Sequence, residues 1–151
     1  MIIRLDDLCG PEIAALLQEH LNDMHAVSPR ESVHALDLDA LKNPEISFWT
    51  IWEDQRLAGC GALKELSASH GEIKSMRTAT DFRRRGVAKA MLTHLLAVAR
   101  RRRYQRLSLE TGSQPFFEPA QKLYAGFGFQ LCAPFAEYRN DPNSVFMTLE
   151  I

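Results

Sequence analysis

The sequence predicts an α/β fold, with one domain over residues 1–151 and a mixed central sheet. In two long segments, apolar residues recur at the three- and four-residue spacing of helices that bury one face. Between these segments lie short runs rich in β-branched and aromatic residues, which are typical of strands. At 151 residues and 46% hydrophobic, the chain can bury one substantial core and is short for two typical domains.

The first part of the chain predicts a strand, two helices and a hairpin. Residues 2–5 form a short apolar strand. A helix begins at Gly10-Pro11, because proline is tolerated in the first turn, and its buried face comprises Ile13, Leu16, Leu17, Leu21 and Met24. A short helix is expected around residues 37–41. The strands 46–52 and 56–66 then form a hairpin that turns at Glu53-Asp54-Gln55.

The rest of the chain predicts alternating strands and helices. Residues 71–78 form a third long strand, and the helix that follows buries a stripe of Ala88, Met91, Leu92, Leu95, Leu96 and Ala99. Residues 106–111 are a strand with apolar Leu107 and Leu109. A second helix over 117–125 stops at Gly126, where we expect a left-handed helix end. Residues 127–131 and an exposed final strand, 145–151, complete the order β-α-α-β-β-β-α-β-α-β-β.

Three consecutive arginines, Arg83, Arg84 and Arg85, stand immediately before the first of these two helices. A helix N-terminus carries about half a positive charge, so cations are unfavourable there unless an anion binds between them. Gly86 then removes the side chain where backbone amides would approach that anion. A solvated turn is the alternative for a lone basic triplet. The position between a strand and a helix favours a phosphate-binding turn.

Composition argues against several other classes of protein. The formal net charge is -1, whereas nucleic-acid-binding domains carry a basic excess, so no nucleic-acid partner is expected. Cys9, Cys60 and Cys132 are scattered without a CxxC pair, and the five histidines lack ligand spacing, so we expect neither disulfides nor a metal site. Because no signal-peptide pattern or membrane-spanning apolar run is evident, we expect a cytoplasmic protein without membrane contact.

Two motifs resemble those of the GNAT superfamily of N-acetyltransferases. Arg83-x-x-Gly86-x-Ala88 is similar to the family's pyrophosphate-binding pattern Gln/Arg-x-x-Gly-x-Gly/Ala. The segment from Ala120 to Phe129 resembles the family's Ala-x-x-Leu-Tyr-x-x-x-Gly-Phe. The two motifs have the family's order and separation and cover the C-terminal half, whereas the N-terminal half matches in element order only. The resemblance implies a small single-domain member, with a mostly antiparallel sheet flanked by helices.

The resemblance also implies how acetyl-CoA, the expected co-substrate, would bind. The backbone of Met76, Arg77 and Thr78 would pair with the pantetheine arm, as an added strand pairs with a sheet edge. Arg83 would support the loop or the phosphates. The pyrophosphate would bind the backbone amides of the loop residues Arg84, Arg85, Gly86, Val87, Ala88 and Lys89.

Tyr124 matches the tyrosine that protonates the departing thiolate in many family members. The alternative for Tyr124 is a core aromatic in a helix stripe. Phe117 departs from the pattern, because many members carry an asparagine there that contacts the cofactor. Ser113, Gln114 and Phe117 are therefore the remaining candidates for this contact.

Amine acylation needs a base, because a free alkyl amine is mostly protonated at neutral pH. We expect Glu72 in this role, since some family members place a base at the matching position. Strand alternation puts Glu72, Lys74, Met76 and Thr78 on one face and Ile73 and Ser75 on the other. Lys74 could instead hold Glu72 in a purely structural ion pair. Glu110 and Glu65 are the alternative bases.

The acceptor is expected to bind between residues 25–34 and 136–144. Candidate contacts are Ser28, Glu31, Ser32, His34, Glu137, Tyr138 and Asn143. The expected reaction is direct acetyl transfer, in a ternary complex, to a primary amine of a small molecule or peptide. A covalent cysteine intermediate is not expected, because no histidine pairs with Cys60 or Cys132. Alternatives left open are a non-catalytic acyl-CoA-binding module and a homodimer formed through the final strand.

Overall fold

The computed structural model describes residues 1–34 and 36–151, which build one seven-stranded sheet in the order β1-β2-β3-β4-β5-β7-β6. Strands β4 and β5 are parallel, and the other neighbouring pairs are antiparallel. The predicted mixed, mostly antiparallel α/β sheet is confirmed. The strands are β1 (Ile2–Leu5), β2 (Ile46–Glu53), β3 (Arg56–Ser67), β4 (His70–Thr78), β5 (Arg106–Gly112), β6 (Gln130–Leu131) and β7 (Ser144–Glu150).

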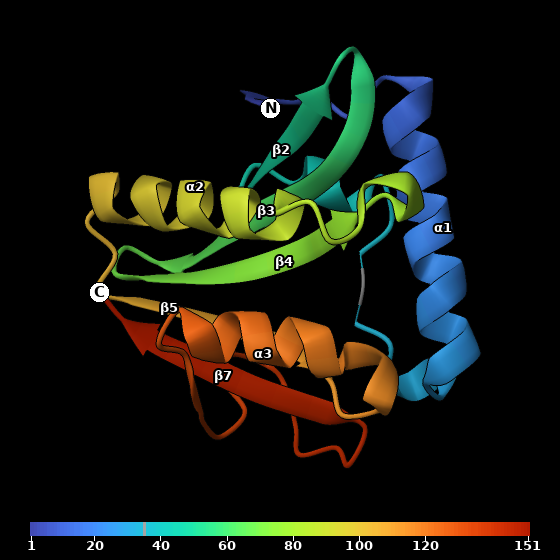
Figure 1. Ribbon diagram of the computed structural model, residues 1–151. Coiled ribbons are helices and arrows are strands. Elements are labelled where there is room, and N and C mark those ends of the chain that lie inside the picture. Colours follow the sequence, from blue (N-terminus) through green and yellow to red (C-terminus); the bar gives the residue numbers. More distant parts are fainter. Residues whose placement is uncertain (35) are drawn as a thin grey trace.

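Helices cover both faces of this sheet. Figure 1 shows α2 lying along β3 and β4, and α3 lying along β5 and β7. Helix α1 packs on the opposite face, in a separate core. The helices are α1 (Pro11–Val27), α2 (Val87–Arg101) and α3 (Glu118–Gly126), with 3-10 turns η1 (Arg30–Ser32), η2 (Ala40–Lys42), η3 (Thr80–Phe82) and η4 (Pro115–Phe117). The predicted order is confirmed. The helix expected around 37–41 is the single turn η2, in which only Leu41 is buried.

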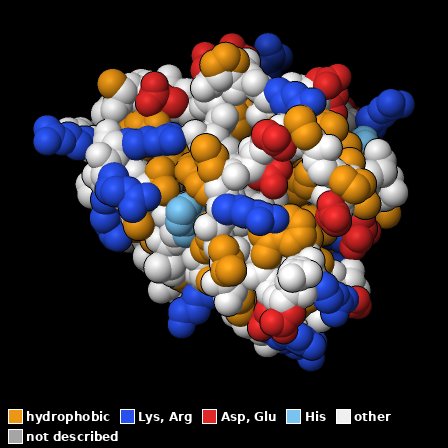
Figure 2. All heavy atoms as spheres, turned by 90° about the horizontal axis from the view of Figure 1, so that it is seen from above, with side chains coloured by type: hydrophobic (Ala, Val, Ile, Leu, Met, Phe, Trp, Pro, Cys, Tyr) orange, Lys and Arg blue, Asp and Glu red, His pale blue; other side chains and the backbone are white. Residues whose placement is uncertain are grey.

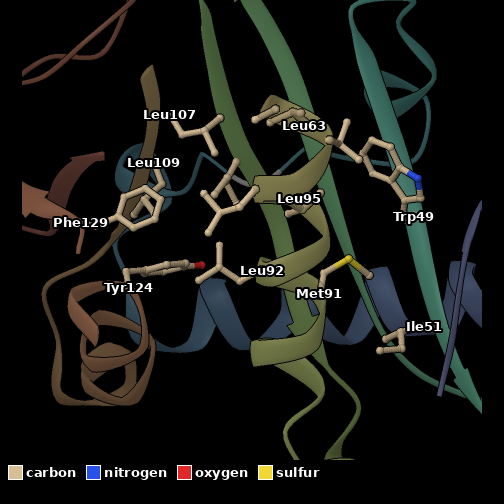
Figure 3. Packing of buried hydrophobic residues seen from close by; sticks show 14 of the residues in the cluster. Trp49, Ile51, Leu63, Met91, Leu92, Leu95, Leu107, Leu109, Tyr124 and Phe129 are labelled. Atoms are coloured by element: carbon tan, nitrogen blue, oxygen red, sulfur yellow. The ribbon is translucent and has the colours of Figure 1, made fainter. Parts of the chain in front are cut away.

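The larger hydrophobic core lies between the sheet and helices α2 and α3. Met91, Leu92 and Leu95 of α2 are at most 1% exposed, as their three- and four-residue spacing predicts. Figure 3 shows them beside Leu63, Leu107 and Leu109 of the sheet, with Tyr124 and Phe129 closing the α3 side. A second core lies beneath α1 and joins Ile13, Leu16 and Leu17 to Phe48 and Ala62.

The end of α3 and the strands after it differ from the prediction. Gly126 does not adopt a left-handed conformation; Gly128 does, with φ 100°. The chain turns at Gly128 and buries Phe129 in the core, so the strand expected over 127–131 is reduced to Gln130–Leu131. This short strand pairs with β7, and β5 covers the other edge of β7. The final strand is therefore internal, and the predicted exposed edge for a homodimer is wrong.

Candidate active site

Strands β4 and β5 separate halfway along their length, and this separation organises the site. Their ladder runs from His70↔Arg106 to Ile73↔Leu109. Beyond it, β4 continues to Thr78 along β3, while β5 continues to Gly112 along β7. Figure 1 shows the two strands spreading apart toward the end near α1. The facing backbone edges beyond Ile73 and Leu109 can therefore accept an extended ligand as an added strand.

A β-bulge in β4 changes which side chains face the acceptor side. Lys74 pairs with Ala62 and Arg77 with Cys60, so two residues of β4 oppose the single residue Gly61. Ser75 in this bulge has φ 55°. A Cβ at Gly61 would lie 2.7 Å from Met91 and 3.0 Å from the Met76 sulfur, so glycine makes room for the bulge.

The bulge contradicts part of the predicted alternation along β4. Ile73 and Met76 both pack in the core beneath α2, and Thr78 follows Met76 onto that face. Glu72, Lys74 and Arg77 lie on the opposite face, which we call the acceptor face. Met76 and Thr78 were expected beside Glu72, and that expectation is wrong because the extra residue reverses the alternation after Lys74.

The arginine turn has the backbone geometry that an anion site requires. Arg84 and Gly86 have left-handed φ values of 64° and 80°, with Arg85 between them, and such alternation directs successive N–H groups into a shared concavity. Helix α2 begins at Val87, and the first N–H groups of a helix lack intrahelical partners. Arg83, Arg84, Arg85 and Lys89 are exposed. Val87 is buried in the core, so it can offer only its backbone to a ligand.

Cation–π contacts and an ion pair support the arginine turn. Phe82 is buried, and the guanidinium groups of Arg56 and Arg85 lie 4.9 Å and 5.4 Å from its ring centroid. Arg56 also pairs with Asp81 at 2.9 Å. The turn is therefore held by η3 on one side and α2 on the other.

The Arg77 side chain is directed away from the arginine turn. Its guanidinium lies 2.6 Å from Glu19 and 2.7 Å from Asp23, both in α1. Thr80 also donates a 2.9 Å hydrogen bond to Glu19. Arg77 can therefore offer a cofactor only its backbone, while its side chain fastens α1 to β4.

Tyr124 of α3 lies near Glu110, the first residue of β5 beyond its ladder with β4. Its ring packs edge-on against Phe129 at 5.8 Å, and Figure 3 shows its hydroxyl directed toward Leu92 of α2. Burial raises the pKa of the Tyr124 phenol, and the nearby negative charge of Glu110 raises it further. The phenol is therefore protonated at neutral pH and is available as a proton donor.

On the acceptor face, Glu72 belongs to a closed network of three side chains. The Glu72 side chain is buried, and its Oε2 atom accepts a 2.5 Å hydrogen bond from the Tyr138 hydroxyl. Lys74 Nζ forms an ion pair with the same oxygen at 3.1 Å. Lys74 Nζ also donates to the Tyr138 hydroxyl at 2.9 Å. The ion pair anticipated between Lys74 and Glu72 is therefore present. Tyr138 completes it from the loop between β6 and β7, residues 132–143, which we call the late loop.

Glu110 lies on the same face and in a different environment. It is the first residue of β5 beyond the ladder with β4 and pairs with Phe146 of β7. Burial raises the pKa of Glu110 to about 7; Lys74 opposes this rise, and the negative charges of Glu72 and Asp141 add to it. Glu65, the third candidate base, accepts a 2.8 Å hydrogen bond from Tyr104 and pairs with Gly71, on the far side of the ladder from the separation.

A family model described as "Acetyltransferase (GNAT) family" matches residues 13–129. The chain belongs to the GNAT family. It is 58% identical over 151 residues to an uncharacterized N-acetyltransferase, YsnE of Bacillus subtilis, with 100% of both chains covered. It is 51% identical to the uncharacterized N-acetyltransferase YedL of Escherichia coli, over 99% of this chain and 94% of that protein. A putative acyl-CoA N-acyltransferase of Klebsiella pneumoniae superposes with a TM-score of 0.83 at 29% identity, covering 99% and 96% of the two chains.

These relatives confirm the enzyme class predicted for this GNAT protein, an acetyl-CoA-dependent N-acetyltransferase, in preference to a non-catalytic binding module. In residues 1–34 and 36–151, no helix has both the length and the apolar character needed to cross a membrane. The face shown in Figure 2 carries basic and acidic side chains interspersed with apolar ones, in keeping with the net charge of -1.

The position of the family asparagine is occupied in this GNAT chain by a packing residue. Phe117 is 8% exposed, and a Cβ at Gly112 would lie 2.1 Å from its ring. Phe117 therefore covers the end of β5, and glycine is required beneath it. Beside it, Gln121 donates a 2.7 Å hydrogen bond to the Gly112 carbonyl. This contact commits the Gln121 amide to the strand end.

Ser113 and Gln114 connect the end of β5 to the late loop. The Ser113 hydroxyl donates to the Pro142 carbonyl at 2.6 Å, and Gln114 Nε2 donates to Asn143 Oδ1 at 2.9 Å. These bonds anchor the late loop to the end of β5, whereas Gln114 Oε1 is buried without a partner among the described residues. The cofactor contact considered for Ser113 and Gln114 stays a prediction.

The two segments expected to bind the acceptor meet on the acceptor face. Ser32 donates a 2.6 Å hydrogen bond to Asp141, and the rings of His34 and Tyr138 lie edge-to-face at 5.1 Å. Asn143 lies beside them, with Nδ2 3.4 Å from the Ser32 hydroxyl. Ser28 ends α1 by donating its backbone N–H to Met24, and Glu31 and Glu137 are exposed. Sequence reasoning missed Asp141, for which the polar run Asn140-Asp141-Pro142-Asn143 was the available signal.

Proposed function

We propose that this protein transfers an acetyl group from acetyl-CoA to a primary amine of a small molecule or peptide, by direct attack in a ternary complex. The observation that carries the proposal is the separation of β4 and β5. It brings the backbone anion site at the start of α2, the Tyr124 phenol and two carboxylates, Glu72 and Glu110, to one opening in the sheet.

The residues present fit acetyl-CoA. The N–H groups between Arg84 and Lys89 suit the pyrophosphate, and the absence of a side chain at Gly86 leaves the approach open, with no atom within 4 Å of a Cβ built there. The backbone of Met76, Arg77 and Thr78 would pair with the pantetheine arm. A GNAT acetyltransferase of Elizabethkingia anophelis, whose structure has acetyl-CoA bound, shares this fold with a TM-score of 0.72 at 18% identity, over 99% and 97% of the two chains.

The chemistry uses groups on both faces of the sheet. A carboxylate of the acceptor face, Glu72 or Glu110, takes a proton from the substrate ammonium. The freed nitrogen forms a bond to the acetyl carbonyl carbon, and the carbon–sulfur bond breaks with its electron pair moving to sulfur. Tyr124 donates a proton to that sulfur and recovers one from the nitrogen, so amide, thiol and one released proton are the products.

The cysteines favour direct transfer over a covalent intermediate. Burial raises the pKa of the Cys60 thiol to about 12, and this thiol donates to the Ser75 carbonyl at 3.2 Å. Burial also raises the pKa of Cys132. Because the thiolate is the nucleophilic form, neither group is activated for attack on the thioester.

The acceptor face favours a cationic substrate. Glu72, Glu110 and Asp141 lie around Lys74, so carboxylates outnumber the one lysine of this cluster. Burial, with the nearby Lys74 charge, lowers the pKa of His34, which keeps that ring neutral. An ammonium group is therefore attracted to the place where its proton is removed.

The test combines binding and turnover. Calorimetry with acetyl-CoA should show binding, and thiol release with butylamine, spermidine and a lysine-containing peptide should identify an accepted amine. With that amine, Tyr124→Phe should lower kcat by about 100-fold, the lower end for loss of a general acid, without weakening acetyl-CoA binding. Tyr104→Phe, which removes a tyrosine–carboxylate bond far from the site, is the matched control. Wild-type turnover by the Tyr124 variant would contradict its role.

A further inference from the structure

Glu72 and Glu110, the two candidate bases on the acceptor face, differ in what surrounds them. Glu72 is 2% exposed, and both of its described side-chain bonds fall on one oxygen, Oε2. Glu110 lies at the open end of the ladder and forms no salt bridge with the residues that the structure describes. Carboxylates in such different surroundings are suited to different roles.

We propose that Tyr138 and Lys74 hold Glu72 in place as a hydrogen-bonded anchor, and that Glu110 accepts the proton of the acceptor amine. This inference rests on the proposed acetyl transfer, because it divides roles within that reaction. It makes Tyr138 a positioning residue, which acts through Glu72, and Glu110 a catalytic residue.

Glu72 is poorly placed to accept a proton because its charge pairs with the buried Lys74 ammonium. The Tyr138 hydroxyl receives a hydrogen bond from Lys74 and gives its own hydrogen to Glu72, while Lys74 also donates to Glu72. All three contacts stabilise the charged carboxylate. Protonation of either Glu72 oxygen would neutralise the carboxylate and leave the buried Lys74 charge without its partner, which is costly.

Tyr138 is held firmly enough to fix this geometry. Its ring lies edge-on to His34 and Phe135, each at 5.1 Å, and 5.5 Å from Phe146. These rings come from the segment after η1, the late loop and β7. The hydroxyl is therefore positioned by both acceptor segments, and Glu72 is in turn positioned by the hydroxyl.

Glu110 is suited to receive and release a proton. Charged or titratable groups face it from each neighbouring element: Lys74 and Glu72 from β4, Asp141 and Tyr138 from the late loop, and Tyr124 from α3. Burial, with the nearby negative charge of Glu72, raises the pKa of Glu110 to about 7, the range in which a general base is most effective. The proton leaves the ammonium nitrogen, forms an O–H bond on Glu110 and passes to water after product release.

The test compares two isosteric substitutions across pH, using acetyl-CoA and whichever of butylamine, spermidine or the lysine-containing peptide is accepted. Glu110→Gln should lower kcat/KM by at least about 100-fold and abolish the acidic limb near pH 7. Glu72→Gln should lower kcat/KM by a smaller factor, about tenfold, and move that limb to lower pH, because a negative charge beside Glu110 is lost. The reverse pattern would overturn the inference.

A direct titration removes the dependence on substrate. In the full chain with 13C-labelled glutamate carboxyls, the signal assigned by its loss in Glu110→Gln should titrate near neutrality, and Glu72→Gln should shift it to lower pH. Titration of Glu110 in the range of an exposed carboxylate would overturn the inference. Activity that survives both substitutions would instead contradict the carboxylate base in the proposed function.

The positioning role of Tyr138 has its own readout. Tyr138→Phe keeps the ring and removes the hydroxyl, so the 13C chemical shift of the Glu72 carboxyl at neutral pH should move with the loss of its hydrogen bond, and kcat/KM for the amine should fall several-fold. Acetyl-CoA affinity should not change. Tyr104→Phe removes a similar bond to Glu65 and should affect neither readout. An unchanged Glu72 chemical shift in Tyr138→Phe would overturn the positioning role.

Discussion

Arg77 Nη2 lies 2.6 Å from Glu19 Oε1. This contact joins β4, the strand expected to hold the pantetheine arm, to helix α1. A second carboxylate, Asp23, lies 2.7 Å from the same nitrogen. The guanidinium is 6% exposed, whereas the two carboxylates are 45% and 35% exposed. One buried cation therefore holds two acidic residues of α1 together.

Arg77→Met should destabilise the protein by about 2 kcal/mol, because both carboxylates lose their cation and are left close to each other. Urea unfolding at neutral pH measures the change. Arg56→Met is the control, since Arg56 and Asp81 form a pair with side chains 62% and 73% exposed, for which we expect less than about 1 kcal/mol. Equal losses from the two variants would show that the Arg77 contacts add nothing beyond a surface ion pair.

Gly86→Ala should strain the arginine turn without creating a clash. The cost is in the backbone, because φ at Gly86 is 80° and no atom lies within 4 Å of the added Cβ. An L-residue in this conformation costs about 1–2 kcal/mol, and relaxation of the strain would redirect the N–H groups, so calorimetry with CoA should show weaker binding.

Gly126→Ala is the matched control for that substitution. Gly126 also has open space around its Cβ position, but it ends α3 with an ordinary φ. Alanine there should leave CoA binding unchanged and stabilise the protein by up to about 1 kcal/mol. If Gly86→Ala bound CoA as tightly as Gly126→Ala, the anion site would have to lie elsewhere.

His20 should make the protein sensitive to acid. Burial, with the nearby Arg77 charge, lowers its pKa from 6.5 to about 4, and its Nδ1 atom is buried without a partner among the described residues. The unfolded chain therefore binds a proton at a higher pH than the folded protein does. Stability from this group is complete above pH 6.5 and is lost as pH falls toward 4, by up to about 3 kcal/mol.

His20→Leu should remove this part of the acid sensitivity. Urea unfolding measured from about pH 7.5 to about pH 4 spans both pKa values of His20. It gives the slope of unfolding free energy against pH for each variant. We expect a shallower slope for His20→Leu. His25→Leu, at an exposed position of the same helix, should keep the wild-type slope. A wild-type slope in both variants would mean that His20 does not titrate in this way.

Much of the fold could be predicted because its signals are local. The apolar stripe of α2, the hairpin turn at Asp54 and Gln55, and the arginine turn before Val87 depend on residues within a few positions of each other. For the same reason, Gly86 and Tyr124 could be recognised from short motifs. By contrast, the left-handed conformation was predicted at Gly126 and occurs at Gly128, because burial of Phe129 in the core determines where the chain turns.

The sequence by itself determined the α/β class, the family motifs and which side chains have suitable chemistry, because composition and short-range spacing carry that information. Only the tertiary structure decided which of those side chains meet. Tyr138 reaches Glu72 across 66 residues, and Ser32 reaches Asp141 across 109. The bulge at Ser75 turned Met76 away from Glu72. Such contacts follow from sheet order and strand mismatch, which arise when distant segments pack and leave no periodic signal in either segment.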